Sequence, residues 1–445
     1  MAFRDIRKQR RWLSAEEARV IVIGLFVLGL ALAANVSLAQ RLPGGEWLFL
    51  RWSGARAFLA ETISADDGLK GGRSMPDAQL TAINRFVGPY SREIAQRTQD
   101  IVYGRIAFSS EYNYVLNDPF FIVLLYTPLA LVRDFVLARG IWMLLSELAL
   151  IGSVLLALNL SEWQPPPWLY TTLFGFGLFQ YFSLNALVTG SPAIMLIFLY
   201  LWILLALRSY ADELAGVLLS LVAYQWEVGG LFFVFILFFV LTNRRWRVLA
   251  GLVMALFVLL AISFLTNSGW GLPYIRAVLS TWYRAAGLTL SYILTTWFPN
   301  IQFPLAPVIS LALAIILFIE WAETVHAHFR RVVWTAALSL AATPLIGFPI
   351  FPSNHVVLIL PFILILALVW ERWQRYRVVR ILLLLIPVLA IPFALYIRAV
   401  SVYDPLVLNL ISILPPVAAI VGLYWMRWWA VRSPRIWFDR IGDYA

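Results

Sequence analysis

The sequence predicts an all-α membrane protein, a polytopic bundle of about 11 to 13 transmembrane helices. Two observations support this fold class. Of the 445 residues, 62% are hydrophobic and only 13% are charged, whereas soluble domains are typically ~45–50% apolar and ~25% charged. Apolar stretches of about 18 or more residues also recur along the chain, which is the length that a helix needs to cross a bilayer. This composition excludes a soluble enzyme, a disordered chain and a nucleic-acid-binding module.

The charges mark the topology of the chain. The formal net charge is +10, and the Lys and Arg residues form short clusters between apolar stretches, as expected for residues that stay in the cytoplasm. A basic segment at residues 1–16 precedes an apolar helix at 17–39, which is longer than the core of a cleavable signal peptide. We therefore expect a multi-pass protein of the plasma (inner) membrane with a cytoplasmic N-terminus. The chain has no cysteine, which excludes disulfides and thiolate metal sites.

Residues 40–118 form the longest non-apolar stretch and are predicted to be an extracytoplasmic loop. Two runs in it have helical spacing of apolar residues, one near 46–61 and one near 92–105. Both are expected to be amphipathic helices at the membrane surface. A Gly-rich link between them contains Asp66-Asp67, which either binds a divalent cation or is simply solvated. No cofactor is expected.

Residues 119–426 are predicted to form the helical bundle, followed by a cytoplasmic tail at 427–445. The Arg clusters alternate correctly when the spans are counted back from the C-terminus, but counting forward from the first span conflicts by one crossing. The segments 119–132, 168–184 and 212–225 are short for a core of ~30 Å. We therefore predict that one of them does not cross fully. The aromatic-rich stretch near 267–304 is either an interfacial belt or a roof over a lipid or sugar groove.

Few residues are candidates for chemistry. Glu46 follows Pro43-Gly44-Gly45 just beyond the first span, where a carboxylate is either a general base or a solvated loop residue. Glu227 lies between two short apolar segments, and an ionisable residue at membrane depth is a functional candidate. Asn354 and His355, at the mouth of a span, either bind a phosphate or sugar hydroxyl or form a helix cap. No Walker loop or Rossmann fingerprint is present.

Four stretches of the chain resemble the GT-C superfamily of membrane glycosyltransferases, and within it family 87, whose members use polyprenyl-phosphate sugars. They are GGEWLFLRWSGARAFL (44–59), GPYSREIAQRTQDIVYGR (88–105), DPFFIVLLYTPLALV with DFVLARGIWMLLSELAL (118–150), and ELAGVLLSLVAYQWEVGGLFF (213–233). The likeness covers most of the first 240 residues. Trp47 stands where the family pattern has Asp, and Gln225-Trp226 stands where relatives often carry Lys-Pro.

The resemblance implies an inverting hexosyltransferase. It would move a monosaccharide from a polyprenyl-phosphate donor to a glycolipid or envelope glycan on the outer face of the membrane. Glu46 would be the base, since it is the carboxylate nearest to the Asp position of the family. The expected substrate contacts are Arg56, Tyr90, Gln225 and Glu227, with Asn354 and His355 at the donor phosphate. Membrane lipids are the other expected partners, and neither a metal nor nucleic acid is expected.

Two alternatives remain open. A lipid or solute transporter or flippase would need polar residues along a path through the bundle, and the later spans, such as 304–319, contain few. A non-catalytic relative would bind lipid-linked sugar without turnover. The Trp47 and Gln225 replacements favour this second alternative.

Overall fold

The computed structural model describes residues 15–67, 88–90, 94–96, 98, 115–284, 289–301, 305–373, 375–402 and 405–431. Every regular element within these ranges is a helix, which confirms the predicted fold class. Most of the second predicted surface helix lies outside the described residues, as do the side chains of Asp66 and Asp67.

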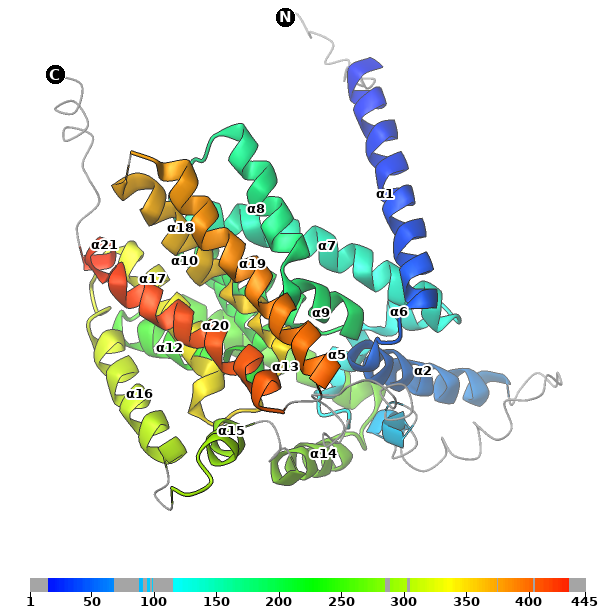
Figure 1. Ribbon diagram of the computed structural model, residues 1–445. Coiled ribbons are helices and arrows are strands. Elements are labelled where there is room, and N and C mark those ends of the chain that lie inside the picture. The colour runs from blue at the N-terminus through cyan, green and yellow to red at the C-terminus, as the bar shows by residue number, and fades with distance from the viewer. Residues whose placement is uncertain are drawn as a thin grey trace, which may run out of the picture.

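The first span is α1 (Ala15–Arg41), which packs along α7 (Phe135–Leu160). The two helices come closest at Gly140, where an added Cβ would lie 2.5 Å from Val36 Cγ2. From Ile21 to Leu30, α1 is exposed and apolar, as a lipid-facing helix should be, and this part of α1 stands apart from the other helices in Figure 1.

Helices cover the other predicted spans, several of them shorter than predicted or broken. Their helices are α8 (Pro167–Phe179), α9 (Tyr181–Thr189), α10 (Ala193–Arg208), α11 (Asp212–Val222), α12 (Trp226–Thr242), α13 (Trp246–Thr266), α16 (Leu305–Ala322), α17 (Phe329–Ala342), α18 (Ile359–Arg372), α19 (Arg377–Val402) and α20 (Pro405–Trp425). In the described ranges, six helices are long and apolar enough to cross a membrane, or seven if α9 and α10, bent by 118°, are one span. The lower count arises because several predicted spans are short or broken helices, such as α8 and α9, which are separated at Gln180.

The predicted topological conflict is resolved at residues 119–132. This segment forms two short helices, α5 (Phe120–Leu125) and α6 (Thr127–Ala130), of six and four residues. Arg139, near the start of α7, donates to the carbonyl oxygens of Ala39 and Leu42 at the end of α1. The end of α1 and the start of α7 therefore lie at the same end of the bundle, and α5 and α6 are too short to cross it. We call this the site end.

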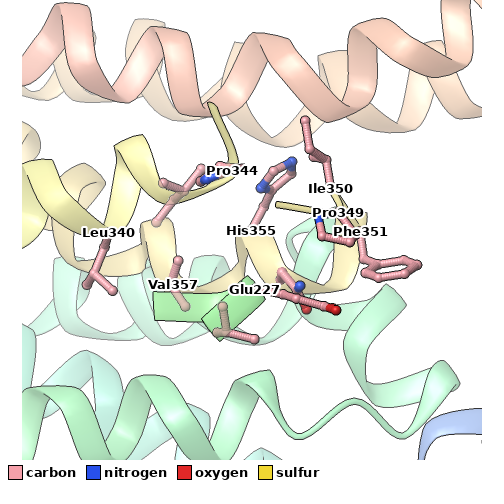
Figure 2. Close-up of a pocket in the computed structure, with 11 residues that line it drawn as sticks. Glu227, Leu340, Pro344, Pro349, Ile350, Phe351, His355 and Val357 are labelled. Atoms are coloured by element: carbon pink, nitrogen blue, oxygen red, sulfur yellow. The ribbon is translucent and has the colours of Figure 1, made fainter. Parts of the chain in front are cut away.

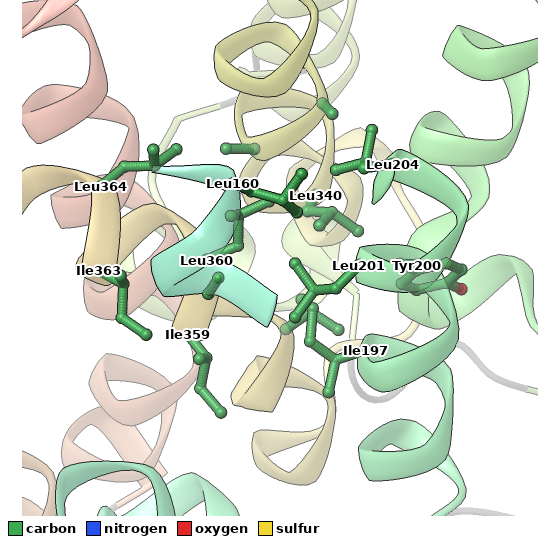
Figure 3. Close-up of a cluster of buried hydrophobic side chains, with 14 of the residues drawn as sticks. Leu160, Ile197, Tyr200, Leu201, Leu204, Leu340, Ile359, Leu360, Ile363 and Leu364 are labelled. Atoms are coloured by element: carbon green, nitrogen blue, oxygen red, sulfur yellow. The ribbon is translucent and has the colours of Figure 1, made fainter. Parts of the chain in front are cut away.

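The core of the bundle is aliphatic. Ile197 and Leu201 of α10 pack with Leu340 of α17 and with Leu360 of α18 (Figure 3). Lipid tails are as apolar as these side chains, so helices in a membrane are held together by close packing more than by exclusion of water. The closest pair is α11 and α13, where Gly216 and Gly251 face each other's backbones.

The end of the bundle opposite the site end is closed by ion pairs between loops and helix ends. Glu162 bonds Arg208 and Arg330, Asp212 bonds Arg245, and Glu320 bonds Arg331 and Arg427. Arg427 begins the short helix α21 (Arg427–Val431). We call these three groups the charged layer.

The site end carries helices that do not span the bundle: α2 (Glu46–Asp67), η1 (Gly88–Tyr90), α14 (Gly271–Arg284), α15 (Leu290–Trp297), η3 (Thr343–Ile346) and η4 (Pro352–Leu358). Figure 1 shows α2, α14 and α15 gathered at this end. The face of α2 predicted to be apolar is buried at Leu48, Trp52 and Ala55. Leu50 and Arg51 are buried as well, so protein covers α2 on more than the predicted face.

Candidate active site

The N-terminus of α2 is fixed by two glycines that no larger residue could replace without strain. Gly45 has a φ of +90°, and an added Cβ would meet Arg139 Cδ at 3.0 Å. Gly190, at the bend between α9 and α10, has a φ of +69° and lies against Leu48. Such left-handed conformations strongly favour glycine. Glu46, the first residue of α2, is thereby held in the protein with only 3% of its surface exposed.

A buried ion pair lies one turn further along α2. Arg51 Nε is 2.7 Å from Asp118 Oδ2, Arg51 Nη2 donates to Oδ1 at 3.2 Å, and the two side chains are 2% and 1% exposed. Arg51 Nη1 also donates to the carbonyl oxygen of Trp47 at 2.8 Å. A planar guanidinium matches a carboxylate in this two-pronged geometry. The pair fixes α2 to the segment that leads into α5.

Two predicted substrate contacts bond Asp118 instead. Gln225 Nε2 donates to Asp118 Oδ1 at 3.0 Å, and the Tyr90 hydroxyl donates to the Asp118 carbonyl oxygen at 2.9 Å. Burial, followed by the nearby Asp118 carboxylate, raises the pKa of Tyr90, so its hydroxyl remains a donor. We call Arg51, Asp118, Tyr90 and Gln225 the Asp118 node.

Sequence reasoning missed Asp118 as a site residue. It was placed only as the last residue of the predicted extracytoplasmic loop, although it begins the DPFF stretch of the family resemblance. Its partner Arg51 is 67 residues away in the sequence, so no local pattern connects them. The available signal was a lone carboxylate immediately before an apolar segment, where a charge requires a partner once it is buried.

A pocket beside the node brings together three predicted site residues. Glu227 of α12 lines it with Asn354 and His355 of η4. Figure 2 shows the Glu227 and His355 side chains at its wall together with the Phe351 ring. The other lining residues are mostly apolar, including Leu340, Ile350 and Val357. An apolar pocket with a few convergent polar groups is typical of a ligand site.

The tautomer of His355 follows from its hydrogen bond. Its Nε2 lies 2.8 Å from the carbonyl oxygen of Ser412. A carbonyl only accepts, so Nε2 carries the proton, and Nδ1 of the neutral ring is an acceptor. The Phe182 ring meets the imidazole edge to face at 5.3 Å between centroids. Packing and hydrogen bonding therefore fix this ring in one orientation.

The pocket and α2 are in direct contact. The Trp47 and Phe351 rings meet edge to face, with 5.2 Å between their centroids, and Phe351 lines the pocket. Glu46 is thus one residue from a side chain in contact with the pocket wall. Gln225 and Glu227, two residues apart, connect the Asp118 node to the same pocket.

Of the predicted substrate contacts, Arg56, Tyr90 and Gln225 do not line this pocket. Arg56 lies on α2, away from Asp118. Its guanidinium carbon lies 5.1 Å from the centroid of the Trp52 ring, a cation–π arrangement on α2. Among the described residues, no group of three or more His, Asp or Glu side chains is arranged to hold a metal ion.

Comparison with known families decides the classification of this helical bundle. The model of glycosyltransferase family 87 matches residues 116–395, more than half of the chain. The chain belongs to glycosyltransferase family 87. It is accordingly a membrane glycosyltransferase by family, as the resemblance predicted. The comparison with curated proteins and the comparison with solved structures each gave no match.

The family-87 match divides the site between two parts of the chain. The matched region contains Asp118, Gln225, Glu227 and the η4 residues Asn354 and His355. The α2 residues, Glu46 among them, precede the match, as does Tyr90. In this family-87 protein the pocket wall therefore comes from the matched bundle, whereas α2 comes from the segment before it.

Proposed function

We propose that this family-87 protein transfers a monosaccharide from a polyprenyl phosphate to a hydroxyl of a lipid or envelope glycan. The reaction takes place at the site end, which we assign to the outer face of the inner membrane because the basic clusters lie at the opposite end. The observation that carries this proposal is the pocket that joins Glu227, Asn354 and His355 beside the start of α2. Carboxylate, amide and imidazole groups are suited to bind sugar hydroxyls.

Glu46 is the proposed general base. Its carboxylate takes the proton of the acceptor hydroxyl while the acceptor oxygen forms a bond to the anomeric carbon. The bond between that carbon and the phosphate oxygen breaks, and the polyprenyl phosphate leaves with the electron pair. A single displacement of this kind inverts the anomeric configuration. No nucleotide is involved, which is consistent with the lack of a nucleotide-binding motif.

The proposed sugar contacts are the polar groups of the pocket. Neutral His355 accepts a hydrogen bond from a sugar hydroxyl at Nδ1, since Nε2 donates to the Ser412 carbonyl oxygen. A protonated ring would instead donate from Nδ1 to the donor phosphate. Asn354 and Glu227 bind the remaining hydroxyls. Gln225 and Tyr90 act through Asp118, which they bond directly. Arg56 offers a partly covered guanidinium for the phosphate, because the ring contact at Trp52 leaves its donors free to turn.

The pocket is narrow as it stands, with room for about one water molecule (~10 Å³). A sugar ring would have to move its lining side chains apart, and the polyprenyl chain would stay in the lipid.

The test is sugar transfer by purified protein in nanodiscs, with a panel of polyprenyl-phosphate monosaccharides as donors and membrane lipid extract as acceptor. Glu46→Gln keeps the side-chain shape and removes the base, so we expect transfer to fall at least ~100-fold with donor binding retained. Glu227→Gln should weaken donor binding. Glu162→Gln, in the charged layer at the opposite end, is the matched control and should transfer normally.

Other results of this transfer assay would each point to a different function or a different base. Loss of transfer in Glu227→Gln but not in Glu46→Gln would move the base to Glu227. Donor binding without turnover by the wild type would identify a non-catalytic relative. Neither binding nor turnover, together with uptake of solute or lipid by reconstituted protein, would favour a transporter, which must open the charged layer to pass its cargo.

A further inference from the structure

Helix α14 (Gly271–Arg284) has two unlike faces. Leu272, Ile275 and Leu279, spaced three and four residues apart, are 59%, 53% and 48% exposed. On the other side, Ala277 is buried, as is Trp270 just before the helix. An apolar stripe on the exposed side is unusual for a helix in water, where that side is normally polar.

The inner face of α14 covers the first-loop part of the site. The Trp270 ring stacks on Phe120 of α5, with 6.3 Å between centroids. Tyr274 approaches Tyr90 of the Asp118 node, with 6.2 Å between ring centroids. These two aromatic residues face the protein, as a roof would, whereas Tyr292 of α15 is exposed, as an interfacial belt requires.

The exposed face of α14 continues a lipid-facing surface. Helix α13 is long and apolar enough to span the membrane, and Phe264 and Leu265 in its last turn are exposed. Only residues 267–270 separate the end of α13 from α14. Since α13 crosses the lipid, its last turn lies near the boundary between lipid and water, and α14 begins at the same depth.

One basic residue flanks the stripe. Arg276 is exposed beside Ile275, where its guanidinium can reach lipid phosphates while the apolar side chains point into the acyl layer. A basic residue next to an apolar stripe is the pattern of helices that lie in the membrane interface.

We propose that α14 is an in-plane membrane-binding helix. Leu272, Ile275 and Leu279 insert into the lipid leaflet at the site end, and Arg276 lies at its headgroup phosphates. The occupant of this surface is the bilayer in which the protein is embedded. The leaflet thereby holds the roof formed by Trp270 and Tyr274 over the Asp118 node. This inference does not depend on the reaction proposed above.

The chain lacks cysteine, so single substitutions can be spin-labelled without background. Leu272→Cys, Ile275→Cys and Leu279→Cys are labelled with a nitroxide and reconstituted in nanodiscs of phosphatidylcholine and phosphatidylglycerol. Power-saturation EPR compares collisions with oxygen, which enters lipid, and with a water-soluble nickel chelate. Val253→Cys on the exposed surface of α13 is the lipid control. Ser209→Cys, in the turn before α11, is the water control.

We expect all three α14 labels to collide mainly with oxygen, as Val253→Cys does. Their depth should lie between those of the two controls, as for a helix in the interface. Collisions with nickel at the level of Ser209→Cys would overturn the proposal. Labels that are immobilised and shielded from both reagents would also overturn it, because they would indicate a protein partner on this face. If one variant does not fold, the other two report on the same stripe.

Discussion

At the scale of single residues, the buried carboxylate of Asp118 anchors one side of the site. Asp118 is 1% exposed and bonded by Arg51, by Gln225 and, through its carbonyl oxygen, by Tyr90. A buried charge is tolerated when its partner and hydrogen bonds replace the lost water. Both oxygens of the Asp118 carboxylate are engaged in this way, Oδ2 by Arg51 and Oδ1 by Arg51 and Gln225.

Removing one member of this pair should be costly. Asp118→Asn leaves the Arg51 guanidinium buried without its counter-charge, and we expect a loss of ~3–5 kcal/mol of stability. The measurement is the apparent Tm in detergent by scanning fluorimetry. The double variant Arg51→Met with Asp118→Leu should recover much of the loss, because a matched apolar pair leaves no unpaired charge.

The control is Glu162→Gln, which alters a half-exposed ion pair in the charged layer. Such pairs contribute ~0–1 kcal/mol, so its Tm should stay near that of the wild type. An Asp118→Asn variant as stable as this control would show that the node does not hold α2 in place.

At the scale of helices, close packing depends on glycine. A Cβ on Gly216 of α11 would lie 2.1 Å from the Val248 carbonyl oxygen of α13. A Cβ on Gly251 of α13 would lie 2.5 Å from the Glu213 carbonyl oxygen of α11. Small residues that let two backbones approach are typical of membrane helix interfaces.

Gly216→Ala should therefore force α11 and α13 apart. We expect it to destabilise the protein by ~1–3 kcal/mol, as overpacking generally does, with a lower apparent Tm and less monodisperse protein after extraction. Gly175→Ala in α8 is the matched control, because a Cβ there meets nothing within 4 Å. The control should be neutral or slightly stabilising, since alanine favours a helix. Equal effects of the two substitutions would contradict this account of the interface.

At the scale of the whole molecule, the two ends of the helical bundle differ in what they carry. The short helices and the pocket gather at the site end, and the charged layer closes the other. Figure 1 shows α2 and α14 at the end where α1 finishes, far from where α1 begins. Leu42 and Asp134, which flank the first loop and α5–α6, therefore lie at the same end of the bundle.

A labelling experiment tests this topology. Leu42→Cys and Arg133→Cys flank the first loop and α5–α6, and both positions are exposed. A membrane-impermeant maleimide should label both in intact cells, whereas Ser209→Cys should react only after the membrane is permeabilised. Labelling of positions 42 and 133 from opposite sides would mean that residues 119–132 cross the membrane.

The sequence by itself determined the fold class and the approximate positions of the helices, and it singled out candidate site residues whose roles stay predictions. Apolar length is a local property, which a run of about 20 residues carries regardless of its neighbours. Isolated polar residues at helix ends, such as Glu227 and His355, also stand out from their apolar neighbours in the sequence. Only the tertiary structure decided that these two share a pocket, that Arg51 pairs with Asp118, and that 119–132 stays at one end. These relations depend on how each helix is rotated and which helix it meets, and long-range packing sets both.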